Sequence, residues 1–198
     1  MSPPKRVVLA ITASACAVLA GCTETGTPVA TETSVSTSST SAHPDASGAP
    51  PIENPIEAGR YLADPCQLFT EQELASFGLG KQFPVTTSNG PNCAWRDAEN
   101  RALYGVVFNE GNVNGLSDIY RGNKEGKLAY FEPTTVNGYP AAVADGGTDD
   151  RPDGWCNVFV GMNPGMAFNV SVAGGDPATA CSNVQKIASS VVDKLKES

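Results

Sequence analysis

Cysteines are the residues of this sequence whose type and spacing define a chemistry most clearly. Cys66, Cys93, Cys156 and Cys181 form an even set, and such a set pairs into disulfides in an oxidising compartment. Four cysteines allow three connectivities. We favour Cys66 with Cys93 and Cys156 with Cys181, because each pair then ties a helix terminus to a nearby strand. The gaps between them are too wide for a zinc site, which uses closely spaced cysteines together with histidine.

Other side chains that commonly support catalysis or ligand binding give little signal. The only histidine, His43, lies in a Ser/Thr/Pro-rich stretch, so a catalytic triad would take its base from an unfolded segment. Trp95 and Trp155 each neighbour a cysteine, and we expect both to pack against a disulfide rather than stack on a ligand. The sequence therefore predicts no catalytic residue, no metal site and no cofactor.

The acidic stretch 145–154 is the remaining candidate for a site. Asp149, Asp150 and Asp153 could gather oxygens around calcium, yet Arg151 stands where an EF-hand loop needs an oxygen ligand, and no Glu closes a twelve-residue loop. We interpret the stretch as a solvated turn. Carboxylate pairs of the kind used in glycoside hydrolysis are available by composition in any acidic domain, so their presence alone does not identify an enzyme.

The N-terminal residues predict export and lipid attachment. Lys5 and Arg6 precede an apolar run, Val7 to Leu19, that is too short for a membrane-spanning helix of about 20 residues but fits a signal peptide. The run closes on Leu-Ala-Gly-Cys, which resembles the lipobox of bacterial lipoproteins. This resemblance implies that residues 1–21 are removed and that Cys22 carries a diacylglycerol, which anchors the protein to the lipid bilayer.

Two further segments follow the predicted signal peptide. Residues 22–51 hold the lipidated Cys22 and a tether in which 13 of the 29 residues after Cys22 are Ser or Thr and none is Lys or Arg. Such a composition buries too little apolar surface to fold, so the tether is expected to be disordered. Residues 52–198 have the length of one globular domain. The expected location is the extracytoplasmic face of the cell membrane.

Helices are expected near both ends of this domain. Thr70 and Glu73 form a capping box, in which each side chain satisfies an open backbone amide of the other residue. Toward the C-terminus, Asp176 is expected to cap a helix with Pro177 at its first position. An apolar stripe at helical spacing follows, and it should lie across a sheet; its members are Val184, Ile187, Ala188, Val191 and Leu195.

Hairpins are expected to link the strands between these helices. Asn137-Gly138 is the strongest signal, because a type I′ turn needs a positive φ at both positions. Two more strand pairs are expected, 92–97 with 102–109 and 155–161 with 166–173. Hairpin-linked strands bounded by helices predict an α+β fold: a mainly antiparallel sheet packed by an N-terminal and a C-terminal helix and tied by disulfides.

The motifs around the cysteines resemble those of a known family. They are Pro65-Cys66-Gln67-Leu68, Cys93-Ala94-Trp95, Asn137-Gly138-Tyr139-Pro140-Ala141, Cys156-Asn157-Val158 and Cys181. Together they resemble the actinobacterial lipoproteins classed as domain of unknown function 3558. The resemblance implies a membrane-anchored extracytoplasmic domain with disulfides and brings no known reaction or ligand. The order of elements is also similar to that of Mog1/PsbP-like sandwiches, a likeness of fold only.

Charge narrows the choice of partners. The chain has a net charge of −8, and removal of Lys5 and Arg6 leaves 11 basic against 21 acidic residues. This balance disfavours nucleic acid as a partner. We prefer a non-catalytic accessory or binding module of the cell envelope, whose partner is an envelope protein, a glycan or an apolar ligand. The alternative is an envelope hydrolase that cleaves a cell-wall glycan with paired carboxylates.

Overall fold

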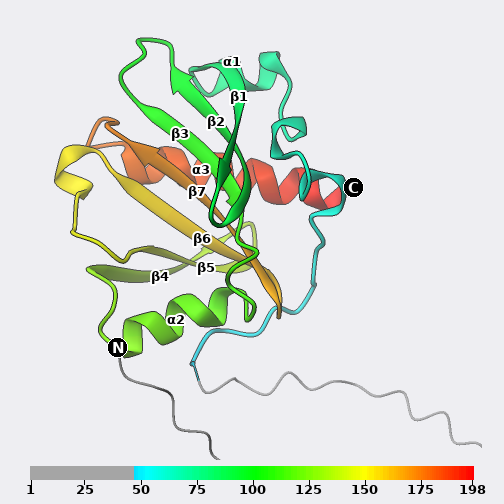
Figure 1. The fold of residues 1–198 in the computed structure, drawn as a ribbon, viewed down its shortest axis with the longest axis vertical. Helices are drawn as coiled ribbons and strands as arrows, with labels where there is room; N and C mark the ends of the chain where they lie inside the picture. The colour runs from blue at the N-terminus through cyan, green and yellow to red at the C-terminus, as the bar shows by residue number, and fades with distance from the viewer. Residues whose placement is uncertain (1–46) are drawn as a thin grey trace, which may run out of the picture. The chain divides into compact units, whose positions relative to one another are not determined.

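A computed structural model describes residues 47–198, which form one antiparallel sheet with helices on both faces (Figure 1). The predicted α+β class and the antiparallel sheet are confirmed. The predicted signal peptide, Cys22 and the tether up to residue 46 lie outside the described residues. Within residues 47–198, no helix has both the length and the apolar character needed to cross a membrane.

The sheet consists of two antiparallel meanders that meet at its centre. Its seven strands lie in the order β1-β2-β3-β7-β6-β5-β4, and every neighbouring pair is antiparallel. The first meander contains β1 to β3 and the second contains β4 to β7. The strands are β1 Leu79–Thr87, β2 Gly90–Asp97, β3 Leu103–Phe108, β4 Tyr130–Val136, β5 Tyr139–Asp145, β6 Cys156–Asn163 and β7 Met166–Ala173.

Three α-helices cover the sheet unequally. The longest, α3 (Ala180–Lys196), packs on β6 and β7 from one side, which we call the core face. Helix α2 (Leu116–Lys124) packs on β5 and β6 from the opposite side, the second face. Helix α1 (Glu71–Ser76) lies against β1, and Figure 1 shows α1 and α2 at opposite ends of the view. Three short 3-10 turns complete the domain: Gly59–Tyr61, Pro65–Gln67 and Arg151–Asp153.

Strand alternation divides the side chains between the two faces. In β7, Phe168 and Val170 are fully buried in the main hydrophobic cluster on the core face, whereas Ala167, Asn169 and Ser171 face the other way because successive strand side chains alternate. The predicted stripe of α3 is confirmed, since all five of its members are buried in the core-face cluster. A smaller cluster lies under α2 on the second face.

Several local predictions are confirmed in atomic detail. The Thr70–Glu73 capping box is present at the start of α1. Asn137 and Gly138 have φ angles of 47° and 83°, as a type I′ turn between β4 and β5 requires. The structure also joins Cys66 to Cys93 and Cys156 to Cys181, the favoured pairing. Each bond closes a loop of 27 or 25 residues, which stabilises the fold by about 3.5 kcal/mol in the chain-entropy model.

The start of α3 differs from the prediction. The helix begins at Ala180 with Thr179 in the capping position, and not at Pro177. Asp176 instead accepts a hydrogen bond from the backbone N–H of Ala178 at 2.9 Å, while its carbonyl oxygen accepts from the N–H of Ala180 at 2.8 Å. Asp176 and Pro177 therefore form a turn that leads into the helix.

The environment of Trp155 was also predicted wrongly. Its side chain is 47% exposed, whereas Trp95 is fully buried in the core-face cluster. The reason is strand alternation: Cys156 points to the core face, so the residue before it points to the second face. A cysteine next in sequence therefore directs Trp155 away from the disulfide.

The strand β1 and the packing of residues 47–51 were not predicted. Strand β1 has no clear alternation of apolar and polar residues, because only Leu79 among its nine residues is buried. Residues 47–51 belong to the predicted tether, yet Ala49 is buried in the cluster under α2 with Leu116 and Tyr120. A small apolar residue can fill a gap between helix and sheet even within a segment of low hydrophobicity.

Both edge strands carry a proline near their centre. Pro84 lies in β1 and Pro133 in β4, the two strands that end the sheet. Proline lacks a backbone N–H and is tolerated within sheets mainly at such edges. Neither edge therefore offers an unbroken row of hydrogen-bonding groups.

Candidate functional site

The cysteine and acidic residues singled out in the sequence have structural roles. The disulfide residues Cys93 and Cys156 are fully buried. In the acidic stretch, Arg151 donates to Asp149 at 2.7 Å, pairs with Glu132 and lies 4.1 Å from the centre of the Tyr130 ring. The hydrogen bond from Arg151 lowers the pKa of Asp149. No group of three His, Cys, Asp or Glu side chains within residues 47–198 is arranged to hold a metal ion.

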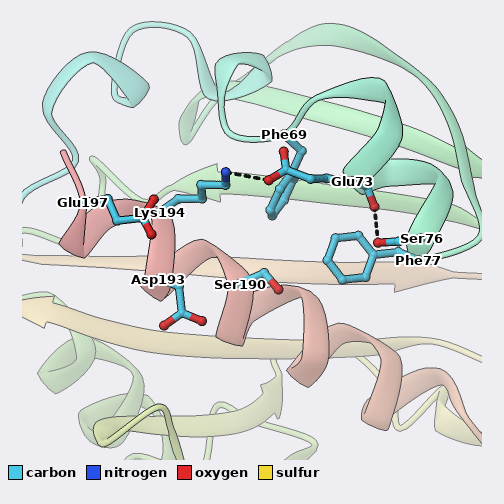
Figure 2. Close-up of a pocket in the computed structure, with 8 residues that line it drawn as sticks. All are labelled: Phe69, Glu73, Ser76, Phe77, Ser190, Asp193, Lys194 and Glu197. Atoms are coloured by element: carbon cyan, nitrogen blue, oxygen red, sulfur yellow. Dashed lines mark hydrogen bonds and ion pairs between the residues drawn. The ribbon is translucent and has the colours of Figure 1, made fainter.

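A groove between α1 and α3 is the candidate site, because its lining combines aromatic rings with charged side chains. Its volume is about 260 Å³. The residues that line it come from two segments more than 110 positions apart in the sequence, and Figure 2 shows them facing one another across the groove. We call it the α1–α3 groove; its lining residues are Phe69, Glu73, Ser76, Phe77, Ser190, Asp193, Lys194 and Glu197.

Aromatic rings form the apolar part of this groove. The rings of Phe69 and Phe77 meet edge to face with centroids 5.6 Å apart, and Phe69 in turn lies 5.9 Å from the ring of Trp95. Trp95 lies two residues after Cys93, which is joined to Cys66 in the 3-10 turn that precedes α1. A covalent bond and a chain of ring contacts therefore fix the position of Phe77. A wider depression of about 770 Å³, lined largely by hydroxyl and amide side chains, also borders Phe77.

The charged groups of the groove are paired with each other. Lys194 Nζ lies 2.5 Å from Glu73 Oε1, and the backbone N–H of Thr70 donates to Glu73 Oε2 at 2.8 Å (Figure 2). The bond to Lys194, followed by that from Thr70, lowers the pKa of Glu73 from 4.5 to about 2, and the pKa of Lys194 is raised by Glu73. The carboxylate that caps α1 thus also joins α1 to α3.

A second polar connection fixes α3 to the β4–β5 turn. Asn137 Nδ2 donates to Asp193 Oδ1 at 2.8 Å and to the carbonyl oxygen of Ser189 at 3.0 Å. The Asn-Gly turn therefore supplies a side chain that orients one carboxylate of the groove. The sequence indicated the turn but gave no sign of this contact, which depends on how α3 crosses the sheet.

The arrangement favours binding over proton transfer. A general acid needs a pKa near the working pH, whereas Glu73 stays ionised down to a pH of about 2. The partly exposed ring of Phe77 and the hydroxyl of Ser190 can contact a ligand without disturbing the ion pair, whereas Phe69 is buried beneath them at 4% exposure. The capping box was visible in the sequence, but the groove was not, because nothing in the sequence relates Glu73 to Lys194.

The structure is that of an α+β domain with a seven-stranded antiparallel sheet and two disulfides. Comparison with known families is more specific: the model of the family described as protein of unknown function (DUF3558) matches residues 17–194. The chain belongs to this family, as the motifs around its cysteines predicted. No curated protein and no solved structure matches the chain significantly, so the likeness to Mog1/PsbP-like sandwiches stays a prediction.

Proposed function

We propose that the protein is a lipoprotein anchored to the extracytoplasmic face of the cell membrane through Cys22, and that its domain is a non-catalytic accessory module of the envelope. The lipobox and the preceding apolar run support the anchor. The family match covers residues 17–194 and so includes Cys22, but the description of the family names no anchor. Residues 22–46 would then link the domain to the bilayer.

The observation that carries the binding role is the α1–α3 groove, with aromatic rings and internally paired charges. Its volume of about 260 Å³ lies just below the roughly 300–1,000 Å³ of typical small-molecule pockets. A groove of this size accepts one or two side chains of a protein partner. Insertion of an apolar side chain beside Phe69 and Phe77 would displace water without breaking the ion pair, as occurs at the centre of protein interfaces.

The hydrolase alternative receives no support from this groove. Glycoside hydrolysis needs one carboxylic acid that is protonated near neutral pH, with its pKa raised. The pKa of Glu73 is lowered to about 2, which is the wrong direction for a general acid. We therefore propose binding of an envelope protein as the function of the groove.

Site-specific photocrosslinking in the native membrane tests this proposal. A photoreactive amino acid at Ser190, in the groove, should give one discrete adduct, and the same amino acid at Lys127, near the end of α2, serves as the matched control. Phe77→Ala and Phe77→Asp should both abolish the adduct while circular dichroism stays unchanged. Equal adducts from both positions, or an adduct that persists in both Phe77 variants, would contradict the role of the groove.

The anchor is tested separately. Mass spectrometry of the membrane-derived protein should find a diacylglycerol-modified Cys22 at the amino terminus. Cys22→Ser should release the protein from the membrane fraction. An unprocessed N-terminus in membrane-derived material would contradict the anchor without affecting the groove.

A further inference from the structure

A second cavity lies where β2 and β3 meet the start of α3. Its volume is about 490 Å³, within the roughly 300–1,000 Å³ of typical small-molecule pockets. Residues of the α1–β1 junction, the β2–β3 turn and the β7–α3 loop line it. We call it the strand-end pocket; its polar side chains are those of Asp97, Arg101, Tyr104, Asp176, Thr179 and Asn183.

Tyr104 contributes a hydroxyl without a partner to this pocket. The residue belongs to the core-face cluster and is only 7% exposed, and its hydroxyl makes no hydrogen bond with any residue of 47–198. The hydroxyl is not one of the fully buried atoms without a partner, so it keeps some accessible surface. Because Tyr104 lines the strand-end pocket, a ligand there can reach this hydroxyl.

Arg101 supplies a cation that its neighbours hold only loosely. Its guanidinium lies 3.4 Å from Glu99 Oε2 and 3.9 Å from Asp97 Oδ2, and its side chain is 74% exposed. Surface ion pairs of this kind contribute little to stability. The planar guanidinium has five N–H donors, whose geometry matches a carboxylate. Arg101 is therefore available to a carboxylate of a ligand.

The start of α3 favours the same ligand group. Thr179, the capping residue, makes no side-chain cap hydrogen bond, and the first backbone N–H groups of a helix attract carboxylates. The side chain of Asn183 makes a single hydrogen bond, to Thr179 Oγ1 at 3.4 Å. Arg101, Tyr104, Asn183 and the helix start therefore all offer hydrogen-bond donors to the pocket.

Two carboxylates of the pocket are held in place by the backbone. Asp97 Oδ1 accepts from the N–H groups of Arg101 at 2.6 Å and Ala102 at 3.0 Å, and Asp176 Oδ1 accepts from the N–H of Ala178 at 2.9 Å. Within residues 47–198, Oδ2 of each carboxylate makes no hydrogen bond. These two oxygens are therefore positioned acceptors for a positively charged group of a ligand.

The nearness of opposite charges defines the ligand. Arg101 Nε and Asp97 Oδ2 are 3.9 Å apart, too far for a hydrogen bond, so each can face an opposite charge of a ligand in which the two charges are also close. In an α-amino acid, one carbon separates the ammonium from the carboxylate. Its zero net charge also avoids the repulsion that a chain of net charge −8 exerts on anions.

We propose that the strand-end pocket binds a zwitterionic α-amino acid. The ligand carboxylate contacts Arg101 and the hydroxyl of Tyr104, and the ligand ammonium contacts Asp97 and Asp176. This site does not depend on the α1–α3 groove, because the two cavities share only Phe77 among their lining residues. Amino-acid binding and protein binding can therefore be tested separately.

The test uses the full-length protein in detergent micelles, titrated calorimetrically with L-leucine, L-glutamine and L-lysine. At least one should bind at millimolar concentration or below. Its carboxamide, which lacks the carboxylate, and its N-acetyl derivative, which lacks the ammonium, should each bind at least tenfold more weakly. Absence of binding to all three amino acids, or equal binding of both derivatives, overturns the proposal.

Variants of the pocket test the contacts. Arg101→Gln should weaken binding at least tenfold, the equivalent of a hydrogen bond to a charged group. Tyr104→Phe should weaken it severalfold and leave the melting temperature unchanged, because the hydroxyl has no partner in the protein. Arg96→Gln, at an exposed arginine of β2, is the matched control and should bind as the parent does. Unchanged affinity in both pocket variants, or an equal loss in Arg96→Gln, overturns the proposal.

Discussion

The core face and the second face of the sheet are made by the same strands, yet their side chains differ in kind. On the core face, Phe168, Val170 and Val172 of β7 pack against the apolar stripe of α3. Among the core-face residues described, Trp95 Nε1 is the only buried side-chain nitrogen or oxygen atom without a hydrogen-bond partner. On the second face, the intervening positions of β7 are Asn169 and Ser171, and two buried amide atoms in this part of the sheet, Asn92 Oδ1 and Asn109 Nδ2, have no hydrogen-bond partner.

This difference indicates that the core face supplies most of the apolar packing that stabilises the fold. The core face is closely packed with large apolar residues, and both disulfides join elements on that side. The second face keeps small and amide side chains where apolar ones would stabilise the fold more. The following variants are ordered from the largest expected effect to the smallest.

Two positions of β7 on opposite faces of the sheet give the most direct test of the comparison. Phe168→Ala should lower the free energy of unfolding by about 3–5 kcal/mol, because it leaves a cavity in the core. Ser171→Ala, three residues away on the other face, should change it by less than about 0.5 kcal/mol. Urea denaturation measures both. Similar losses for the two variants would mean that both faces are structural.

Removal of the disulfides on the core-face side is the next test. Replacing Cys156 and Cys181 together by Ala should lower the free energy of unfolding by about 3.5 kcal/mol, since a 25-residue loop is opened in the unfolded chain. The Cys66 and Cys93 double variant opens a 27-residue loop and should lose a similar amount. Thermal denaturation compares them. An unchanged melting temperature would show that α3 stays on the core face by packing alone.

Removal of an unsatisfied amide tests the second face. Asn109→Leu should raise the free energy of unfolding by about 1 kcal/mol, because Asn109 Nδ2 is buried without a partner. Asn123→Leu, at an exposed position in α2, is the matched control and should have little effect. Destabilisation by Asn109→Leu alone would assign this amide a structural role and remove the contrast between the faces.

The ion pair over the core face gives the smallest effect, and it depends on pH. Glu73→Gln should cost about 1 kcal/mol at pH 7, allowing for solvent screening of a partly exposed pair. Because the folded pKa of about 2 lies below the unfolded value of 4.5, this stabilisation is complete above about pH 4.5 and is lost as the pH falls toward 2.

The difference in stability between the parent and Glu73→Gln should therefore shrink between pH 4.5 and 2, measured by urea denaturation at several pH values. Glu71→Gln, in the same first turn of α1, is the control for removal of an acidic residue near a helix N-terminus. A constant difference across this range would show that Glu73 is not stabilised as a carboxylate by Lys194.

Features that depend on neighbouring residues were predictable from the sequence. The capping box at Thr70, the Asn137-Gly138 turn and the apolar stripe of α3 each arise from local backbone geometry and side-chain periodicity. Turn residues of this kind predicted the hairpins, and strands linked by hairpins predicted an antiparallel sheet. The cysteine pairing was also accessible, because each cysteine lies near the end of a helix or within a strand whose position could be estimated.

Features that depend on sheet register were not predictable. Strand β1 has one buried residue, so no periodicity marked it, and without β1 the neighbour of β2 was unknown. Single asparagines in strands, such as Asn92 and Asn169, carry no signal until the register places both beside Val107. The α1–α3 groove could not be predicted either, because it depends on how α3 crosses the sheet and brings Lys194 to Glu73.

The prolines in the two edge strands affect how readily neighbouring copies of this domain associate. At high local protein density, an open sheet edge allows copies to pair strand by strand and to stack into fibrils. Pro84 in β1 and Pro133 in β4 interrupt the row of backbone N–H groups at the two edges. A strand of a neighbouring copy therefore cannot form a complete set of hydrogen bonds with either edge. Such copies can therefore lie close together without pairing through their sheet edges.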